Sequence, residues 1–78
     1  MVFLETTTSV WRIKPGDKFA VVECPTEFSG EKTAELLCDI EAGGRIKLRF
    51  RNAVLVTEPI VSCSVHGDGW WYEVFSTK

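Results

Sequence analysis

The stretch AELLCDIEAGGRIKLRFR, residues 34–51, alternates apolar and charged side chains on both sides of a Gly-Gly pair. Alternation with a period of two is typical of β-strands that bury one face. A three-residue loop at 42–44, in which one glycine takes a positive φ, would join the two halves as an antiparallel hairpin. The stretch therefore predicts strands over 34–41 and 45–51.

One register of this hairpin satisfies both faces together. Shifting it by one residue would set apolar side chains against basic ones, so the pattern specifies the pairing. The predicted pairs are Ile40 with Ile46, Cys38 with Leu48 and Leu36 with Phe50 on the inner face, and Glu41 with Arg45, Asp39 with Lys47 and Glu35 with Arg51 on the outer face. Arg49, opposite Leu37, is the basic residue that this register leaves without an acidic partner.

Residues Glu31–Ala42 also fit a helix. Ala34, Leu37 and Ile40 are spaced by three, and Gly43 could cap the helix end. A helix does not explain the complementary charges, so the hairpin is favoured and the helix is kept as the alternative.

Two strands are predicted before this hairpin, at Val10–Ile13 and Phe19–Glu23. Between them, the Pro-Gly pair at the centre of Lys14–Asp17 is typical of a type II turn. The polar segment Cys24–Lys32 predicts a loop, with Phe28 either tucked in or exposed.

The strand that begins at Arg45 is expected to continue through Ala53–Val56, which is apolar on both faces. A strand that changes from one-sided to two-sided burial is expected to bend as it enters a barrel or the gap between two sheets. The pair Glu58-Pro59 predicts its end.

The last part of the chain predicts a second hairpin, in which Val61–Val65 alternates and Trp70–Phe75 returns. Five or six strands with short turns in 78 residues indicate one all-β domain spanning residues 1–78. The predicted fold is a small five- to six-stranded antiparallel barrel, SH3-like or OB-like, or a compact sandwich of the same size.

The composition restricts the function classes. The net charge is −2 and no apolar run is long enough to span a bilayer, so no global attraction to nucleic acid or membrane is expected. The N-terminus lacks the pattern of a secretory signal. Three widely spaced cysteines indicate reduced thiols and a cytoplasmic location. Cys38 and Cys63 are expected inside, and Cys24, beside Pro25 at a loop entrance, is expected to react first.

The run Trp70-Trp71-Tyr72 is the most informative local feature for function. Successive side chains of a strand point to opposite faces, so the two tryptophans cannot share one core. A turn at Gly67-Asp68 would place Trp70 inside and Trp71 outside, whereas a turn at Asp68-Gly69 would exchange these roles and set His66 opposite Trp71. Either turn leaves one large aromatic side chain exposed as an anchor for a partner.

Motifs for catalysis and metal binding are weak. Cys63 and His66 have the spacing of half a zinc site, but no second half is present. His66 has no evident nucleophile or orienting carboxylate, and the sequence holds no nucleophile elbow or phosphate-binding loop. We therefore expect no enzyme activity, no metal and no cofactor.

The favoured function is a small protein-interaction module, such as an adaptor, inhibitor or immunity-type protein, that binds a larger protein through exposed aromatic side chains. Self-association as a homodimer is also considered. The predicted binding residues are Trp71, Trp70, Tyr72, His66, Phe28 and Arg49. The alternative is a nucleic-acid-binding barrel that stacks bases on Trp71, Trp11 or Phe28 and holds phosphates with Arg45, Lys47, Arg49 and Arg51.

Overall fold

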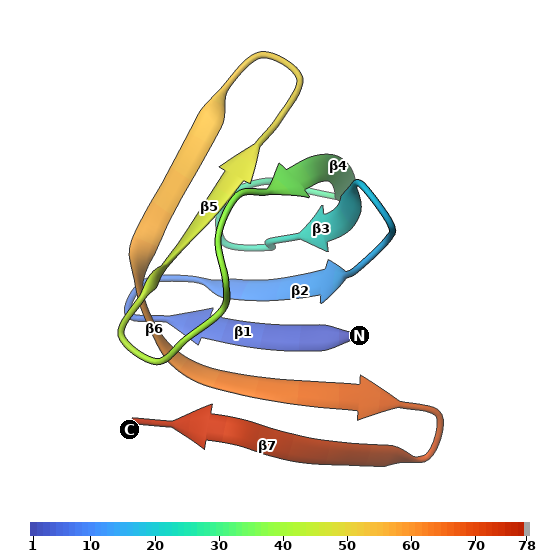
Figure 1. Ribbon diagram of the computed structural model, residues 1–78, viewed down its shortest axis with the longest axis vertical. Helices are drawn as coiled ribbons and strands as arrows, with labels where there is room; N and C mark the ends of the chain where they lie inside the picture. The colour runs from blue at the N-terminus through green and yellow to red at the C-terminus, as the bar shows by residue number, and fades with distance from the viewer. Residues whose placement is uncertain (78) are drawn as a thin grey trace.

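The computed structural model describes residues 1–77, which form seven antiparallel strands (Figure 1). Strands β1 to β6 pair in sequence order, and β1 also pairs with β6, so these six close into a barrel. β7 pairs with β6 alone and extends the sheet outside the closed barrel. The strands are β1 (Val2–Thr6), β2 (Val10–Lys14), β3 (Ala20–Glu23), β4 (Glu31–Leu36), β5 (Arg45–Arg49), β6 (Val54–Gly67) and β7 (Trp70–Ser76).

The prediction of a small all-β barrel is confirmed. The alternative helix over Glu31–Ala42 is wrong, since the described part of the chain holds only strands, turns and loops. No helix long and apolar enough to cross a membrane occurs within residues 1–77.

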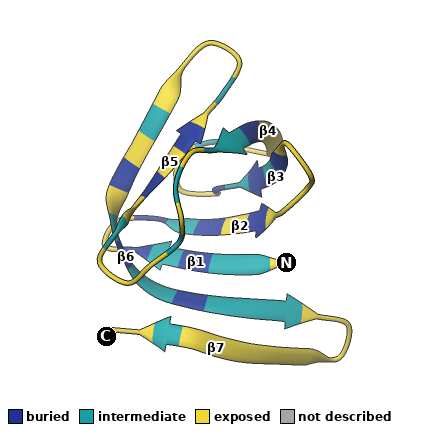
Figure 2. Ribbon diagram, viewed as in Figure 1, coloured by how far each residue is buried: buried dark blue, intermediate teal, exposed yellow. Residues whose placement is uncertain are grey.

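The core lies inside the six-stranded barrel, and burial alternates along its strands (Figure 2). In β2 and β5 every second side chain is buried, while the basic side chains between them face water. The buried apolar residues are Leu4, Trp11, Ile13, Ala20, Val22, Cys24, Ala34, Ile46, Leu48, Ile60 and Cys63.

A hydrogen-bonded turn at residues 6–9 fixes Trp11 in this core. The Thr6 N–H donates to the Ser9 carbonyl (2.8 Å), and the hydroxyls of Thr6 and Ser9 are 2.6 Å apart. The Trp11 indole N–H donates to Ser9 Oγ at 2.8 Å. A fully buried indole keeps its polar atom satisfied in this way. Trp11 is thus a core residue, and its predicted role in base stacking is wrong.

The β4–β5 hairpin forms, but its register differs by two residues from the prediction. Glu35 lies opposite Arg49 and Leu36 opposite Leu48. Because side chains alternate with a period of two, a two-residue shift preserves the predicted faces and changes every partner. β4 also ends at Leu36, so the predicted pairing of residues 37–41 with β5 is wrong.

The last backbone bond from residues 37–44 to β5 runs from the Leu37 N–H to the Lys47 carbonyl (2.8 Å), and beyond it a side chain and β6 take over the hydrogen bonds. The thiol of Cys38 donates to the Arg45 carbonyl and accepts from the Lys47 N–H, both at 3.3 Å. The Gly43 N–H donates to the Ile60 carbonyl (3.1 Å), and the Ile60 N–H donates to the Gly44 carbonyl (2.8 Å). The loop is therefore held by β6. Gly43 has φ of 77°, which confirms a positive-φ glycine in this loop.

The predicted continuous strand from Arg45 to Val56 is also wrong. A turn closed by the Phe50 N–H and the Ala53 carbonyl (2.7 Å) separates β5 from β6. Pro59 does not end β6. It lies between two irregularities, one in the pairing of β6 with β5 and one in its pairing with β1. Proline is tolerated at such bulges, where its missing N–H breaks no ladder. The expected bend thus exists, but it lies within β6.

The turn before β3 differs from the type II prediction. Gly16 does not have a positive φ. A Cβ at this position would overlap the Phe19 carbonyl oxygen, so glycine is needed here for space. β3 begins at Ala20, leaving Phe19 exposed in the turn, and the loop predicted over Cys24–Lys32 ends at Gly30, before β4.

Candidate interaction surface

The β6–β7 hairpin turns at Asp68-Gly69, the second of the two predicted alternatives. Gly67 lies opposite Trp70 and His66 opposite Trp71, with Gly69 at φ of 74°. An Asp-Gly pair is favoured in two-residue hairpin turns because a positive φ is required there. The other alternative, a turn at Gly67-Asp68, is therefore wrong.

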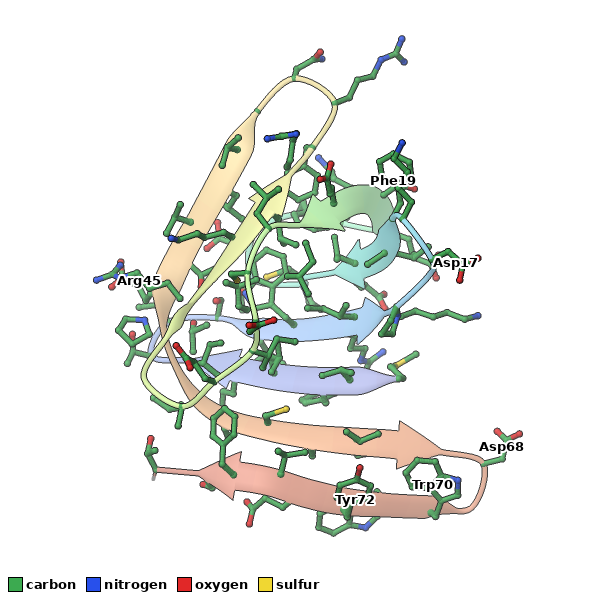
Figure 3. All side chains as sticks on the ribbon, viewed as in Figure 1. Asp17, Phe19, Arg45, Asp68, Trp70 and Tyr72 are labelled. Carbon is green, nitrogen blue, oxygen red and sulfur yellow. The ribbon has the colours of Figure 1, made fainter. Side chains whose placement is uncertain are left out.

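One face of β7 carries a stacked pair of rings. Trp70 and Tyr72 have centroids 5.9 Å apart and planes inclined by 16°. Figure 3 shows both rings together on β7, near Asp68 in the turn. The Trp70 indole covers Gly67, where a Cβ would overlap it. Both rings are still more than half exposed.

The opposite face carries a longer row of side chains in contact, in which one pair of rings is stacked. Trp71 stacks on His66 with a centroid distance of 5.9 Å and an interplanar angle of 18°. His66 contacts Phe3 at 5.8 Å, and the Arg12 guanidinium lies over the Phe3 ring at 5.8 Å. This row, Trp71–His66–Phe3–Arg12, crosses β7, β6, β1 and β2. We call it the outer aromatic row.

The prediction that Trp70 and Trp71 point to opposite faces is confirmed. The prediction that one of them enters the core is wrong, since they are 52% and 66% exposed. The reason is topological. β7 lies outside the closed barrel, so no strand from the other side of the barrel packs over either of its faces. Only Phe75, opposite Cys63, packs partly against the core.

Ser64 and His66 of β6 form a hydrogen-bonded pair on this surface. Ser64 Oγ and His66 Nε2 are 2.9 Å apart, the distance of a nucleophile and its base. A triad also needs a group that orients the histidine, and no carboxylate contact to His66 is found within residues 1–77. No cluster of three or more His, Cys, Asp or Glu side chains suited to a metal occurs in that range.

Phe28 lies in a different place, in a groove at the turn between β5 and β6. Its ring makes edge contacts with Trp11 (6.0 Å) and Phe50 (6.3 Å), and Lys32 Nζ lies 4.9 Å above it. Arg51 and the start of β6 line the same groove. In Figure 1 this turn is at the opposite end of the molecule from β7. Phe28 is therefore not part of the β7 surface.

The basic strand β5 is about half neutralised. Arg49 pairs with Glu35 at 3.6 Å and Arg45 with Glu58 at 3.9 Å. Arg49 was expected to be the unmatched residue, which is wrong because of the two-residue register shift. Lys47 and Arg51 are the two without an ion pair within the described residues.

The three cysteines are free thiols, but their exposure differs from the prediction. Cys24 and Cys63 are buried, and Cys38 is half-buried. Burial raises the pKa of the Cys63 thiol above its ordinary value of 9.0. Cys24 is covered because its side chain turns into the barrel and contacts Thr26 Oγ1 at 3.2 Å. The expected order of reactivity is therefore wrong for Cys24.

The sequence placed four of its six candidate binding residues correctly on one hairpin: Trp70, Trp71, Tyr72 and His66. It missed Phe3, since β1 was not predicted, and with Phe3 it missed the contact that joins Arg12 of β2 to this row. The apolar run Val2–Leu4 followed by polar residues 5–9 was the available signal. No family model matches the chain, and neither the curated proteins nor the solved structures contain a protein that matches it significantly.

Proposed function

We propose that the protein is a small non-catalytic interaction module that binds a larger protein through β7. The observation that carries the proposal is the exposure of this one strand. Trp70, Trp71, Tyr72 and Val74 are each more than half exposed, although they are large apolar residues. Neighbouring exposed apolar side chains of this kind are typical of interaction sites.

The stacking on both faces supports binding by pre-organised rings. Trp70 is held by Tyr72 and Trp71 by His66, so little rotamer entropy remains to be lost when a partner covers them. Tryptophan, tyrosine and arginine dominate the binding energy of protein interfaces. The outer aromatic row places Trp71 and Arg12 on one continuous face.

Capture from an extract of the native host tests the proposal. The immobilised wild-type protein is expected to retain a protein that Trp71→Ala fails to retain, because its anchor is lost. Phe19→Ala is the matched control, since Phe19 is also half exposed (51%) but lies in the turn between β2 and β3, away from β7 (Figure 3). Trp70→Ala examines the other face.

Each retained protein is then purified and titrated against the same variants. A loss of affinity of about 30-fold or more for a Trp anchor corresponds to the 2 kcal/mol of a typical hot spot. If both tryptophan variants fold and bind like the wild type, the proposal is refuted.

Nucleic-acid binding is a second candidate, favoured by the groove around Phe28 and Phe50 with Lys32 and Arg51 at its border. Ion pairing of Arg45 and Arg49 with glutamates weakens this candidate. We expect no sub-micromolar affinity for generic single strands near physiological salt. Strong binding with a log–log salt slope of about −0.7 per phosphate contact, lost in Arg51→Glu, would favour it over the first candidate.

The compartment proposed for this function is the cytoplasm. Three free thiols, two of them buried in the core, support a reducing environment.

A further inference from the structure

Within residues 1–77, β7 has the long strand edge that is left without protection. Natural proteins protect edge strands with charges, prolines, bulges or short length. β7 has seven residues, no proline and a single charge, Glu73, and its one bulge lies near its end, between Glu73 and Phe75. By contrast, the unpaired edge of β6 is shorter and ends at the bulge that holds Pro59.

The backbone groups that β7 offers at this edge follow from the ladder. The His66 N–H donates to the Met1 carbonyl, and the Met1 amine donates to the His66 carbonyl, both at 2.8 Å, so His66 faces β1. Alternation then directs Gly67 and Val65 to β7, where they bond Trp70 and Tyr72. Trp71 and Glu73 therefore present their N–H and C=O groups to the free edge.

We propose that a second copy of this chain occupies the edge, pairing β7 with β7 antiparallel about a two-fold axis at Tyr72. In this register Trp71 of each copy lies opposite Glu73 of the other, so both outward-facing residues exchange hydrogen bonds. The two Tyr72 residues form the non-hydrogen-bonded pair on the axis.

The charge distribution selects this register. An axis at Glu73 would set the two carboxylates directly opposite each other, which is unfavourable. It would also set Phe75 opposite Trp71. The backbone N–H and C=O of Phe75 face β6, so this pair could not exchange hydrogen bonds across the dimer. With the axis at Tyr72 the strand's only charge meets an indole, and no like charges oppose.

Edge pairing leaves both faces of β7 open. The dimer would hold two outer aromatic rows side by side on one continuous sheet, so the proposed interaction function and self-pairing can each fail alone. Capture of a partner tests the faces, whereas the oligomeric state tests the edge.

Sedimentation velocity of the full chain over a wide concentration range is the first experiment, with a reversible dimer expected. Glu73→Pro removes one outward N–H from each copy without removing a bond to β6. Two lost hydrogen bonds should weaken the dimer about 30-fold. Glu73→Thr is the matched control, since it removes the charge and keeps the N–H, and it should dimerise at least as well as the wild type.

Tyr72→Lys is a second variant in case proline disturbs the hairpin. It sets like charges against each other on the axis, and it should also give a monomer. Circular dichroism and thermal melts establish that each variant is folded.

Disulfide trapping tests the register itself, in a Cys38→Ser background. Tyr72→Cys places two thiols on the axis at a separation suited to a disulfide, so added diamide should oxidise them to a covalent dimer. Trp71→Cys and Glu73→Cys face different residues and should cross-link far more slowly. A monomer at every concentration, open-ended assemblies, or a dimer unaffected by Glu73→Pro and Tyr72→Lys would overturn the proposal.

Discussion

Trp11 and Trp71 both lie on β-strands, yet Trp11 has no exposed surface and Trp71 is 66% exposed. β2 belongs to a closed barrel, whereas β7 pairs on one side only. The local sequence pattern makes both segments strands. The closure of the barrel decides which of them has its inner face covered by other strands. The barrel therefore holds the buried core of the domain, and β7 carries the surface that we propose for a partner.

The largest expected effect is the loss of the barrel's central side chain. Trp11→Ala removes a fully buried indole that also bonds Ser9, and it should lower the free energy of unfolding by about 3–5 kcal/mol. For a 78-residue domain this is comparable with its whole stability. Urea unfolding followed by circular dichroism measures it, and a loss below about 1 kcal/mol would contradict the central role of Trp11.

A smaller effect is expected for the tryptophans of β7. Trp70→Ala and Trp71→Ala each remove a ring that is already more than half in water, so each should cost about 1 kcal/mol or less. The same urea titration measures these variants. Losses as large as that of Trp11→Ala would show that β7 contributes to the stability of the fold as much as β2 does.

The sequence predicted what is decided locally. Alternation in residues 34–51 placed the right side chains on the right faces, because a period of two depends only on strand geometry. The partners were wrong by two residues, because the Cys38 thiol and Ile60 of β6 take the backbone bonds of the loop. A local pattern does not contain the bonds that Gly43 and Gly44 make with Ile60, 17 and 16 positions away.

Closure was equally beyond local reasoning. Nothing in Trp70-Trp71-Tyr72 says whether a neighbouring strand will cover it. Because β1 was not predicted, its pairing with β6, which closes the barrel before β7, was missed as well. The exposed aromatic surface was therefore identified, but the exposure of both of its faces was not.

The rates of thiol labelling distinguish cysteines inside the barrel from the cysteine outside it. Cys38 should react first in the native protein, because it is half-buried in the 37–44 loop while Cys24 and Cys63 lie in the core. Labelling under native conditions followed by peptide mass analysis measures the order. Cys38→Ser should remove the fast phase, and fast labelling of Cys24 in that variant would show that the barrel opens near the 24–30 loop.

The smallest expected effect lies where the barrel and β7 meet. Cys63 pairs with Leu4 of β1 on one side and Phe75 of β7 on the other, and burial raises the pKa of its thiol above 9.0. In the unfolded chain the thiol ionises more readily, so the stabilising contribution is complete below about pH 9 and is lost as pH rises through the folded pKa. The free energy of unfolding should therefore fall above that pH, with a slope of at most about 1.4 kcal/mol per unit from this group.

Cys63→Ala isolates the contribution of this thiol. The variant lacks only this thiol, so the effects of all other groups cancel in the difference between the two proteins. Urea unfolding of both from neutral pH to about pH 10 should give curves that converge as pH rises. Parallel curves would mean that water already reaches Cys63 in the folded state. Water would then enter between the barrel and β7. The part of β6 around Cys63 would belong with the uncovered strand β7 and not with the closed core.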